Sequence, residues 1–327
     1  MLLANPGAAP RLPVAARQRA VPAVWLDLVA PTEEERALAE RATGLRVPTE
    51  AELAEIESSS RLHAHGDTLF LSTPMAYRSE EGASRVAPVG FVLSPRHLVT
   101  VRFAPLTAFD HFADRFATGE ARDAAGGICS ASAFVGLLEA IVDRLADVLE
   151  QVGGELDAIS GRVFRQEQGR RRSDRVDAEL RATLRQVGRL GDGLSNIRDG
   201  LLGVSRIVTF VPEAARDWLP EALRPRLKTI RQDLASLTDY DSQMTGKVQF
   251  LLDATLGFIN IEQNNSIKVL TVVSVVGVPP TLVASIYGMN FEHIPELHWP
   301  HGYAYGLAMI ALSAVLPLLW FKRRGWV

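Results

Sequence analysis

The amino-acid sequence predicts an α/β N-terminal domain, followed by long α-helices and two C-terminal transmembrane helices. Residues 21–126 contain short apolar runs separated by Gly, Pro and Ser, which is typical of a mixed α/β unit. Apolar residues at helical spacing replace that pattern after Gly127. The last 62 of the 327 residues carry only six charged side chains, although charged residues make up 22% of the whole chain. The uneven distribution of charge therefore indicates a soluble body joined to a membrane-spanning tail.

Composition excludes several classes of protein. The formal net charge of −3 argues against a nucleic-acid partner, which would require a strongly basic surface. Cys129 is the only cysteine, so neither a disulfide within the chain nor a Cys-x-x-Cys site can form. The sequence contains no Walker loop, His-Glu-x-x-His or Gly-x-Ser-x-Gly motif. We therefore expect neither an enzyme nor a bound cofactor.

The α/β domain is predicted over residues 21–126, after a flexible N-terminal segment at 1–20. That segment lacks the apolar run of roughly 7–15 residues found in a cleaved signal peptide. Thr32 and Glu35 have the spacing of a capping box, and Thr49 and Glu52 repeat it, so each pair opens a helix. The predicted helices cover 32–43 and 51–60, and the predicted strands cover 23–29, 68–73, 89–93 and 97–103.

Long helices are predicted over the next two regions, 127–221 and 222–287. Residues 127–221 are predicted to form two antiparallel helices. The first runs to about residue 166 and the second covers about 173–208, with a basic turn near Arg170 between them. Residues 222–287 form a stalk helix that continues into the first membrane span, because no proline occurs between Pro225 and Pro279. At a rise of about 1.5 Å per residue this helix is about 100 Å long. Such a helix needs partners, which predicts a bundle of several subunits.

Two apolar runs of 19 residues, at 269–287 and 303–321, are long enough to cross a bilayer core. Lys268 precedes the first run, and the basic tail 322–327 follows the second. The loop at 288–302 contains no Lys or Arg, so the positive-inside rule places both termini in the cytoplasm and the loop outside. We therefore expect a two-span protein of the cell (inner) membrane. Interfacial aromatic residues are expected at the span ends, at Trp299, Tyr303, Tyr305, Trp320 and Trp326.

The first span carries polar side chains along one side. At about 100° per residue, Ser274, Thr281 and Ser285 fall within about 40° of one another. We use the name "the stripe" for these three residues together with their neighbours on the same arc or its border, Asn264, Ile267, Leu270 and Val278. Two interpretations are equally open: the stripe lines a pore, or its small side chains let helices approach closely. The Pro279-Pro280 pair is expected to kink the span and to free carbonyl groups that face water in a pore.

The first span ends in Tyr287-Gly288-Met289-Asn290. A Gly-Met-Asn tripeptide at the end of the first of two spans, before a short loop and a basic C-terminus, resembles the CorA family of divalent-cation channels. Similar stretches are NNSIKVLT at 264–271, FEHIPELHW at 291–299, LLDATL at 251–256 and AELAEIESSSRL at 51–62. The resemblance extends over almost the whole chain beyond residue 20. It implies a funnel-shaped homopentameric channel in membrane lipid, which transports Mg²⁺ and also Co²⁺ or Ni²⁺.

The tripeptide suits a hydrated divalent ion. Mg²⁺ releases its water shell reluctantly, and a ring of neutral Asn290 carboxamides hydrogen-bonds that shell without binding the ion too tightly. Gly288 then allows close backbone approach, and Met289 packs to orient the ring. Glu292 and Glu296 of the loop attract cations by their charge. Inward movement of two charges across about 100 mV releases about 4.6 kcal/mol, so uptake follows the electrochemical gradient without ATP.

The resemblance also implies a regulatory metal. Asp253 aligns with a family carboxylate at a cytoplasmic Mg²⁺ site between subunits, where bound metal holds the pore closed. The other interpretation of Asp253 is a solvated aspartate on a helix.

Two alternative functions stay open. His293, His298 and His301 lie in the loop, and imidazole suits zinc, cobalt and nickel better than magnesium, so a proton-coupled zinc transporter of the ZntB type is the first. A membrane regulatory protein that conducts no ions is the second.

Overall fold

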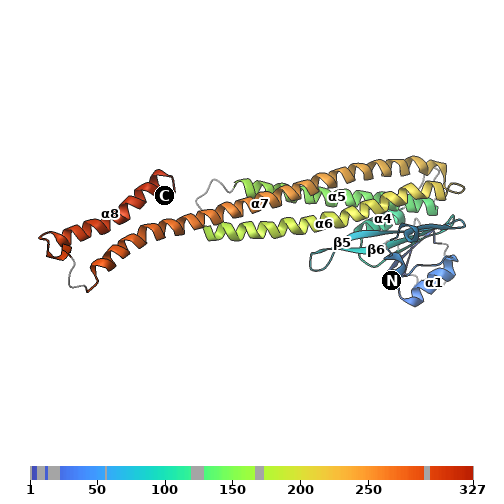
Figure 1. The fold of residues 1–327 in the computed structure, drawn as a ribbon. Coiled ribbons are helices and arrows are strands. Elements are labelled where there is room, and N and C mark those ends of the chain that lie inside the picture. Colours follow the sequence, from blue (N-terminus) through green and yellow to red (C-terminus); the bar gives the residue numbers. More distant parts are fainter. Residues whose placement is uncertain are drawn as a thin grey trace. The chain divides into compact units, whose positions relative to one another are not determined.

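The computed structural model describes residues 2–5, 12–13, 23–55, 57–118, 129–165, 173–290 and 295–326. The chain divides into two compact units, coloured along the sequence in Figure 1. The first unit contains Met1–Arg165 and Arg185–Leu252, and the second contains Gln166–Leu184 and Asp253–Val327. Helix α7 (Arg224–Tyr287) runs without interruption from the first unit into the second, so the predicted continuous helix is confirmed.

Within the described residues, a seven-stranded sheet forms the centre of the first unit, in the order β2-β1-β3-β7-β6-β5-β4. Strands β3 and β7 are parallel, whereas the other neighbouring strands are antiparallel. Gly82, with φ of 78°, takes the left-handed conformation in the turn between β5 and β6. The strands are β1 (Leu2–Asn5), β2 (Leu12–Pro13), β3 (Trp25–Val29), β4 (Leu62–His65), β5 (Thr68–Arg78), β6 (Ser84–Leu93) and β7 (Leu98–Arg102).

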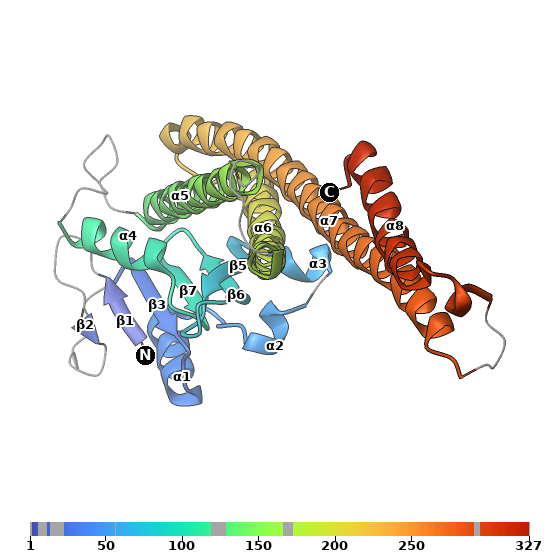
Figure 2. The ribbon, with the colours of Figure 1, turned by 90° about the vertical axis from the view of Figure 1, so that its left-hand side faces the viewer.

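Successive strand residues point to opposite faces of the sheet, and each face has its own core. On one face, Leu26 and Leu28 of β3 pack with Ala39 of α1 (Glu33–Thr43) and Leu53 of α2 (Glu50–Leu53). The other face is aromatic and lies under α4 (Thr107–Thr118) and α5 (Ser130–Arg165), as Figure 2 shows. Its buried rings belong to Trp25, Phe91, Phe109, Phe112, Phe116 and Phe134.

An ion pair is buried in the aromatic face. Arg102 Nη2 lies 3.0 Å from Asp27 Oδ2 and 2.9 Å from Asp110 Oδ1, and both Arg102 and Asp27 are buried. The hydroxyl of Thr100 donates to Asp27 Oδ1 at 2.8 Å, and the indole N–H of Trp25 donates to Thr100 Oγ1 at 2.9 Å. Both charges are therefore hydrogen-bonded, which a buried ion pair requires.

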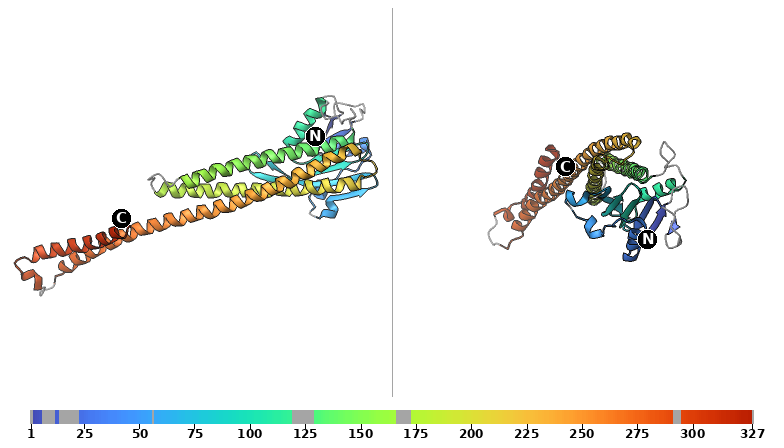
Figure 3. Two further views of the ribbon diagram at one scale, coloured as in Figure 1. Left: turned by 90° about the horizontal axis from the view of Figure 1, so that it is seen from above. Right: turned by 90° about the vertical axis from the view of Figure 1, so that its right-hand side faces the viewer.

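The parts of α5, α6 (Ser173–Ala214) and α7 that belong to the first unit run side by side (Figure 3). Arg226 of α7 donates to Glu139 of α5 at 2.8 Å, and Arg198 of α6 donates to Asp241 of α7 at 2.7 Å. Asp241 is fully buried, and desolvation raises its pKa above the ordinary value, although Arg198 acts in the opposite direction. A short 3-10 helix, η3 (Glu221–Leu223), precedes α7.

The second unit contains the end of α7 and helix α8 (Gly302–Arg323), with the 3-10 helix η4 (Pro295–His298) before α8. Both α7 and α8 are long and apolar enough to cross a membrane, and their apolar segments are largely exposed. The two predicted spans, 269–287 and 303–321, lie within these helices.

Two predictions about the first unit are wrong. The helix predicted over 51–60 is replaced by two single turns: α2, which ends at Leu53 where the N–H of Ala54 donates back to Glu50, and α3 (Ser58–Arg61). Residues 2–5 and 12–13 are strands of the sheet, so the flexible segment predicted at 1–20 does not apply to them. Their partners lie across the fold, as in the pairing of Leu3 with Asp27, and local sequence carries no trace of such contacts. The rest of 1–20 lies outside the described residues.

Other elements are longer than predicted or were not predicted. Strands β5 and β6 extend five residues beyond each predicted outer end, because their outer halves pair with each other up to Arg78 and Ser84. Helix α6 extends to Ala214, past the predicted end at 208. Helix α4 and strand β4 were not predicted; β4 is only four residues long, whereas the helical spacing of Phe109, Phe112 and Phe116 in α4 was overlooked.

Candidate ion pathway

The structure leaves the predicted pore-lining face of α7 uncovered. The exposed residues are Asn264, Ile267, Leu270, Ser274, Val278, Thr281 and Ser285, which together are the stripe. All seven lie on one uninterrupted helix, so helical geometry alone places them on a common arc.

The opposite side of the same helix is partly covered. Between Val272 and Tyr287 the half-buried residues are Val272, Val276, Pro279, Pro280, Val283 and Tyr287. At about 100° per residue, all six lie within about 60° of the line opposite Ser274. Helix α8 runs beside this part of α7 within the second unit (Figures 1 and 3). The stripe is therefore not the surface that α7 uses to contact α8.

Helix α7 continues through Pro279 and Pro280. Because proline has no N–H, the carbonyls four residues earlier, those of Val275 and Val276, lose their helical donors. At about 100° per residue these two residues lie about 100° and 200° from Ser274. The carbonyl of Val275 therefore lies beside the border of the stripe, near the angle of Asn264, whereas that of Val276 lies on the side of α8; that the freed carbonyls face a pore stays a prediction.

The Gly-Met-Asn tripeptide follows directly after the last residue of α7, Tyr287. The N–H of Gly288 donates to the carbonyl of Ala284 at 3.0 Å, and the N–H of Met289 donates to that of Ile286 at 3.3 Å. A Cβ atom at position 288 would lie 3.2 Å from the Ala284 oxygen, so glycine allows the chain to turn closely over the last helical turn. Asn290 is exposed beyond this turn, and Met289 is also exposed in this single chain; the predicted role of Met289 in orienting a ring of Asn290 side chains stays a prediction.

Part of the loop that follows is described. Glu292 and His293 lie outside the described residues, as does the side chain of Glu296, whose backbone belongs to η4. His298 ends η4, and the carbonyl of His301 accepts from Tyr305 at the start of α8. Across the described ranges, no three His, Cys, Asp or Glu side chains gather closely enough to hold a metal ion.

Asp253 is an exposed residue of α7. No cluster of metal ligands surrounds it among the residues that the structure describes.

Aromatic contacts occur at both ends of α8, where interfacial residues were predicted. At its start, the rings of Trp299 and Tyr305 lie 5.7 Å apart. At its end, the guanidinium carbon of Arg324 lies 4.7 Å from the Trp320 ring, and Trp326 stacks on Phe321. Amphipathic rings and cations in these places match the boundary of a bilayer.

These features describe a chain with a large α/β body and two candidate membrane-spanning helices, the first of which exposes a polar stripe that ends at Gly-Met-Asn. A family model described as "CorA-like Mg2+ transporter protein" matches residues 22–323. The chain therefore belongs to the CorA-like family of divalent-cation transporters.

Individual relatives agree with this assignment. The chain is 34% identical over 317 residues to the magnesium transport protein CorA of Escherichia coli K12, which covers 97% of this chain and 96% of that protein. It is 35% identical over 305 residues to the magnesium transport protein CorA of Sodalis glossinidius, covering 93% and 92%. The solved structure of the CorA magnesium transporter from Methanocaldococcus jannaschii has the same fold, with a TM-score of 0.76, 18% identity and coverage of 100% and 99%.

Proposed function

We propose that this chain forms a channel-type transporter through which Mg²⁺, and also Co²⁺ or Ni²⁺, enters the cell down its electrochemical gradient. One observation carries the proposal: the stripe is exposed on the side of α7 opposite α8 and ends at Gly288-Met289-Asn290. Polar side chains that face lipid are costly, so an exposed polar stripe in a span favours a water-filled axis between subunits. Membership of a magnesium-transporter family supports the same ion.

The proposed assembly is a homopentamer in the cell (inner) membrane, with both termini in the cytoplasm. Five copies of α7 would surround the axis, with α8 outside them and the soluble bodies forming a funnel. The basic end of α8, with Lys322 and Arg323 in its last turn, supports the orientation by the positive-inside rule.

At the outer mouth, a ring of Asn290 side chains selects the hydrated ion, and the negative charges of Glu292 and Glu296 raise the local cation concentration. A neutral carboxamide hydrogen-bonds the water shell and still lets the ion leave, which conduction requires. Gly288 provides the close turn that places Asn290 directly after the helix.

Ion flux into proteoliposomes tests the proposal. We expect Mg²⁺ uptake by the wild type and loss of most of that uptake in Asn290→Ala. Asn265→Ala is the matched control, because Asn265 is an exposed residue of the same helix that lies about 180° from Ser274. The absence of flux for Mg²⁺, Co²⁺, Ni²⁺ and Zn²⁺ alike would leave the non-conducting alternative. Zn²⁺ uptake that depends on a pH gradient would favour the zinc transporter.

The proposed regulation uses Asp253. Mg²⁺ bound between Asp253 and a neighbouring subunit would hold the α7 helices together and close the pore, and loss of that metal would loosen them. We expect Asp253→Ala to reduce the inhibition of flux by Mg²⁺ on the cytoplasmic side, whereas Asp239→Ala, an exposed aspartate of the same helix, should not. If cytoplasmic Mg²⁺ inhibits flux through Asp253→Ala as strongly as through the wild type, Asp253 has no regulatory role. That result would not bear on whether the protein conducts ions.

A further inference from the structure

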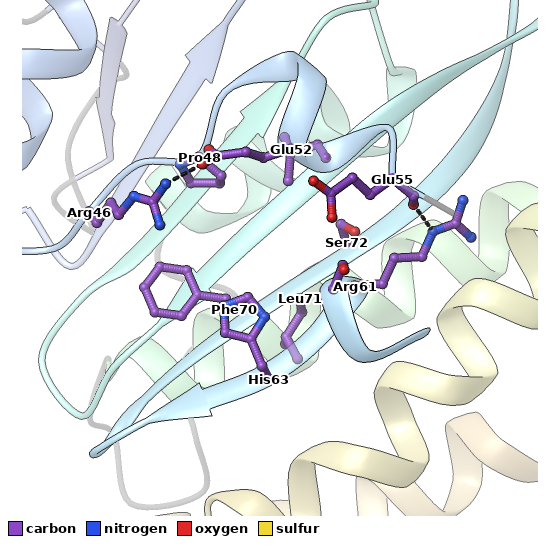
Figure 4. A pocket seen from close by; sticks show the side chains of 11 residues that line it. Arg46, Pro48, Glu52, Glu55, Arg61, His63, Phe70, Leu71 and Ser72 are labelled. Carbon is purple, nitrogen blue, oxygen red and sulfur yellow. Dashed lines mark hydrogen bonds and ion pairs between the residues drawn. The ribbon is translucent and has the colours of Figure 1, made fainter. Parts of the chain in front are cut away.

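A pocket with a volume of about 310 Å³ lies on the soluble body, on the face of the sheet that carries α2. Small-molecule sites in proteins begin at about this volume, so the pocket suits a ligand much smaller than a nucleotide. Sequence reasoning did not identify it, because its residues come from three separate segments. They are Arg46, Pro48, Glu52, Leu53, Glu55, Ser60, Arg61, His63, Phe70, Leu71 and Ser72, of which Figure 4 labels nine.

Two small residues create the hollow. Ser72 of β5 and Gly90 of β6 stand opposite each other in the antiparallel register, so both belong to the same face of the sheet. A Cβ atom at Gly90 would lie 2.6 Å from Leu53 Cδ2, so the Leu53 side chain of α2 packs directly against the glycine backbone. Ser72, beside it, leaves the space that a larger side chain would fill.

Ser72, one of the residues that line this pocket, has an unsatisfied hydroxyl group. The residue is only 6% exposed, and its Oγ has no hydrogen-bond partner among the residues that the structure describes. An unpaired buried polar group costs about 1–3 kcal/mol. A bound group that exchanges a hydrogen bond with Ser72 would recover that cost.

Charged side chains lie at both ends of the pocket. The Glu52 carboxylate accepts hydrogen bonds from Thr49 and forms an ion pair with Arg46. The hydrogen bond from the Thr49 backbone N–H is the largest effect that lowers the pKa of Glu52 below its usual value. Arg46 keeps further N–H donors on its exposed guanidinium. At the other end, the Glu55 carboxylate has no hydrogen-bond or ion-pair partner within the described ranges, and Figure 4 shows it extending toward the pocket.

An aromatic wall completes the pocket. His63 of β4 and Phe70 of β5 are cross-strand neighbours, and their rings stack with centroids 5.0 Å apart and planes 9° apart. Arg61 points away, because its Nε donates to the carbonyl of Glu55 at 2.6 Å. The wall offers apolar area between the charged ends.

We propose that this pocket binds a small zwitterion of the free α-amino-acid class. Its carboxylate pairs with Arg46, its ammonium group pairs with Glu55 and donates to Ser72 Oγ, and its side chain lies against Phe70. The site belongs to the soluble body and goes beyond the proposed ion transport, so its binding is measured without any ion flux.

Thermal unfolding of the full chain in detergent, with free L-leucine, L-alanine and L-glutamine as separate probes, tests the proposal. We expect at least one of them to raise the unfolding temperature, whereas N-acetyl-L-leucine and L-leucinamide, which each lack one of the two charges, do not. Ser72→Ala and Glu55→Gln should each weaken the apparent affinity about tenfold, the effect of one lost hydrogen bond or ion pair.

Two controls separate binding from folding. Glu34→Gln, at an exposed position of α1 outside the pocket, should keep the wild-type response. Without ligand, Ser72→Ala should unfold at the wild-type temperature or above it, because it removes an unsatisfied hydroxyl. The proposal is overturned if no free amino acid shifts the wild type, or if Ser72→Ala responds to them as strongly as the wild type does.

Discussion

The orientation of the first span predicts a difference between two valines that are two residues apart. Val278 belongs to the stripe and is 62% exposed, whereas Val276 is half-buried on the opposite side. We consider Val278→Cys and Val276→Cys, each in a Cys129→Ser background that removes the native thiol. A cationic methanethiosulfonate reagent then places one positive charge on either side of the helix.

The expected block follows from electrostatics. A unit charge about 4 Å from another is repelled by about 4 kcal/mol at an effective dielectric constant of about 20, so a divalent ion is repelled by about 8 kcal/mol. Even a quarter of that energy, about 2 kcal/mol, slows passage about 30-fold. Mg²⁺ flux through modified Val278→Cys should therefore be nearly abolished.

Proteoliposome flux before and after modification is the assay, and Val276→Cys is the matched control. Its thiol lies about 160° around the helix from that of Val278, so the reagent should leave flux close to its starting value. Equal block at both positions, or block at Val276→Cys alone, would refute the assignment of the stripe to the pore.

Three further outcomes test the soluble body. Gly203→Ala should lower the free energy of unfolding by about 1–3 kcal/mol, because the added Cβ atom would lie 2.0 Å from a threonine hydroxyl of β5. The control is Gly188→Ala on the same helix, where the added Cβ atom meets nothing within 4 Å, so stability should be unchanged or higher. Arg102→Leu should cost about 3–5 kcal/mol in urea unfolding, since it leaves the buried carboxylate of Asp27 without its cation. Burial raises the pKa of Asp241 in the folded chain above its ordinary value of 3.8. Between 3.8 and the raised pKa, the folded chain keeps a proton that the unfolded chain has lost, so the free energy of unfolding falls as pH rises through this range. Asp241→Asn should flatten this fall in thermal unfolding across the same pH range, and an unchanged slope would contradict the assignment.

The helical part of the fold could be predicted because its signals are local. An unbroken apolar spacing and the absence of proline before Pro279 indicated α7, and two uncharged runs indicated the hairpin. The capping boxes at Thr32 and Thr49 both form, with each threonine accepting from the glutamate N–H three residues on. Such features depend on neighbours within one or two helical turns, so the sequence displays them directly.

The features that escaped prediction depend on distant partners. Strand β1 is recognisable only through its pairing with β3, and the pocket around Ser72 needs a glycine 18 positions away to make room for α2. For the ion pathway, periodicity placed the stripe on one arc, but only the structure shows that α8 lies on the other side of α7. Periodicity relates residues within one helix and carries no information about which helix becomes its neighbour.

The unbroken course of α7 also has a mechanical consequence. Its 64 residues extend about 96 Å, and intact backbone hydrogen bonds make a helix stiff in torsion. Within the second unit, rotation of α7 about its own axis near Asp253 is therefore carried to Val278, where about half a turn separates the stripe from the side that faces α8. Bending is easiest at Pro279 and Pro280, where two of those hydrogen bonds are missing. Helix α7 thus resists twisting along most of its length and bends most easily at one place, two turns before Gly288.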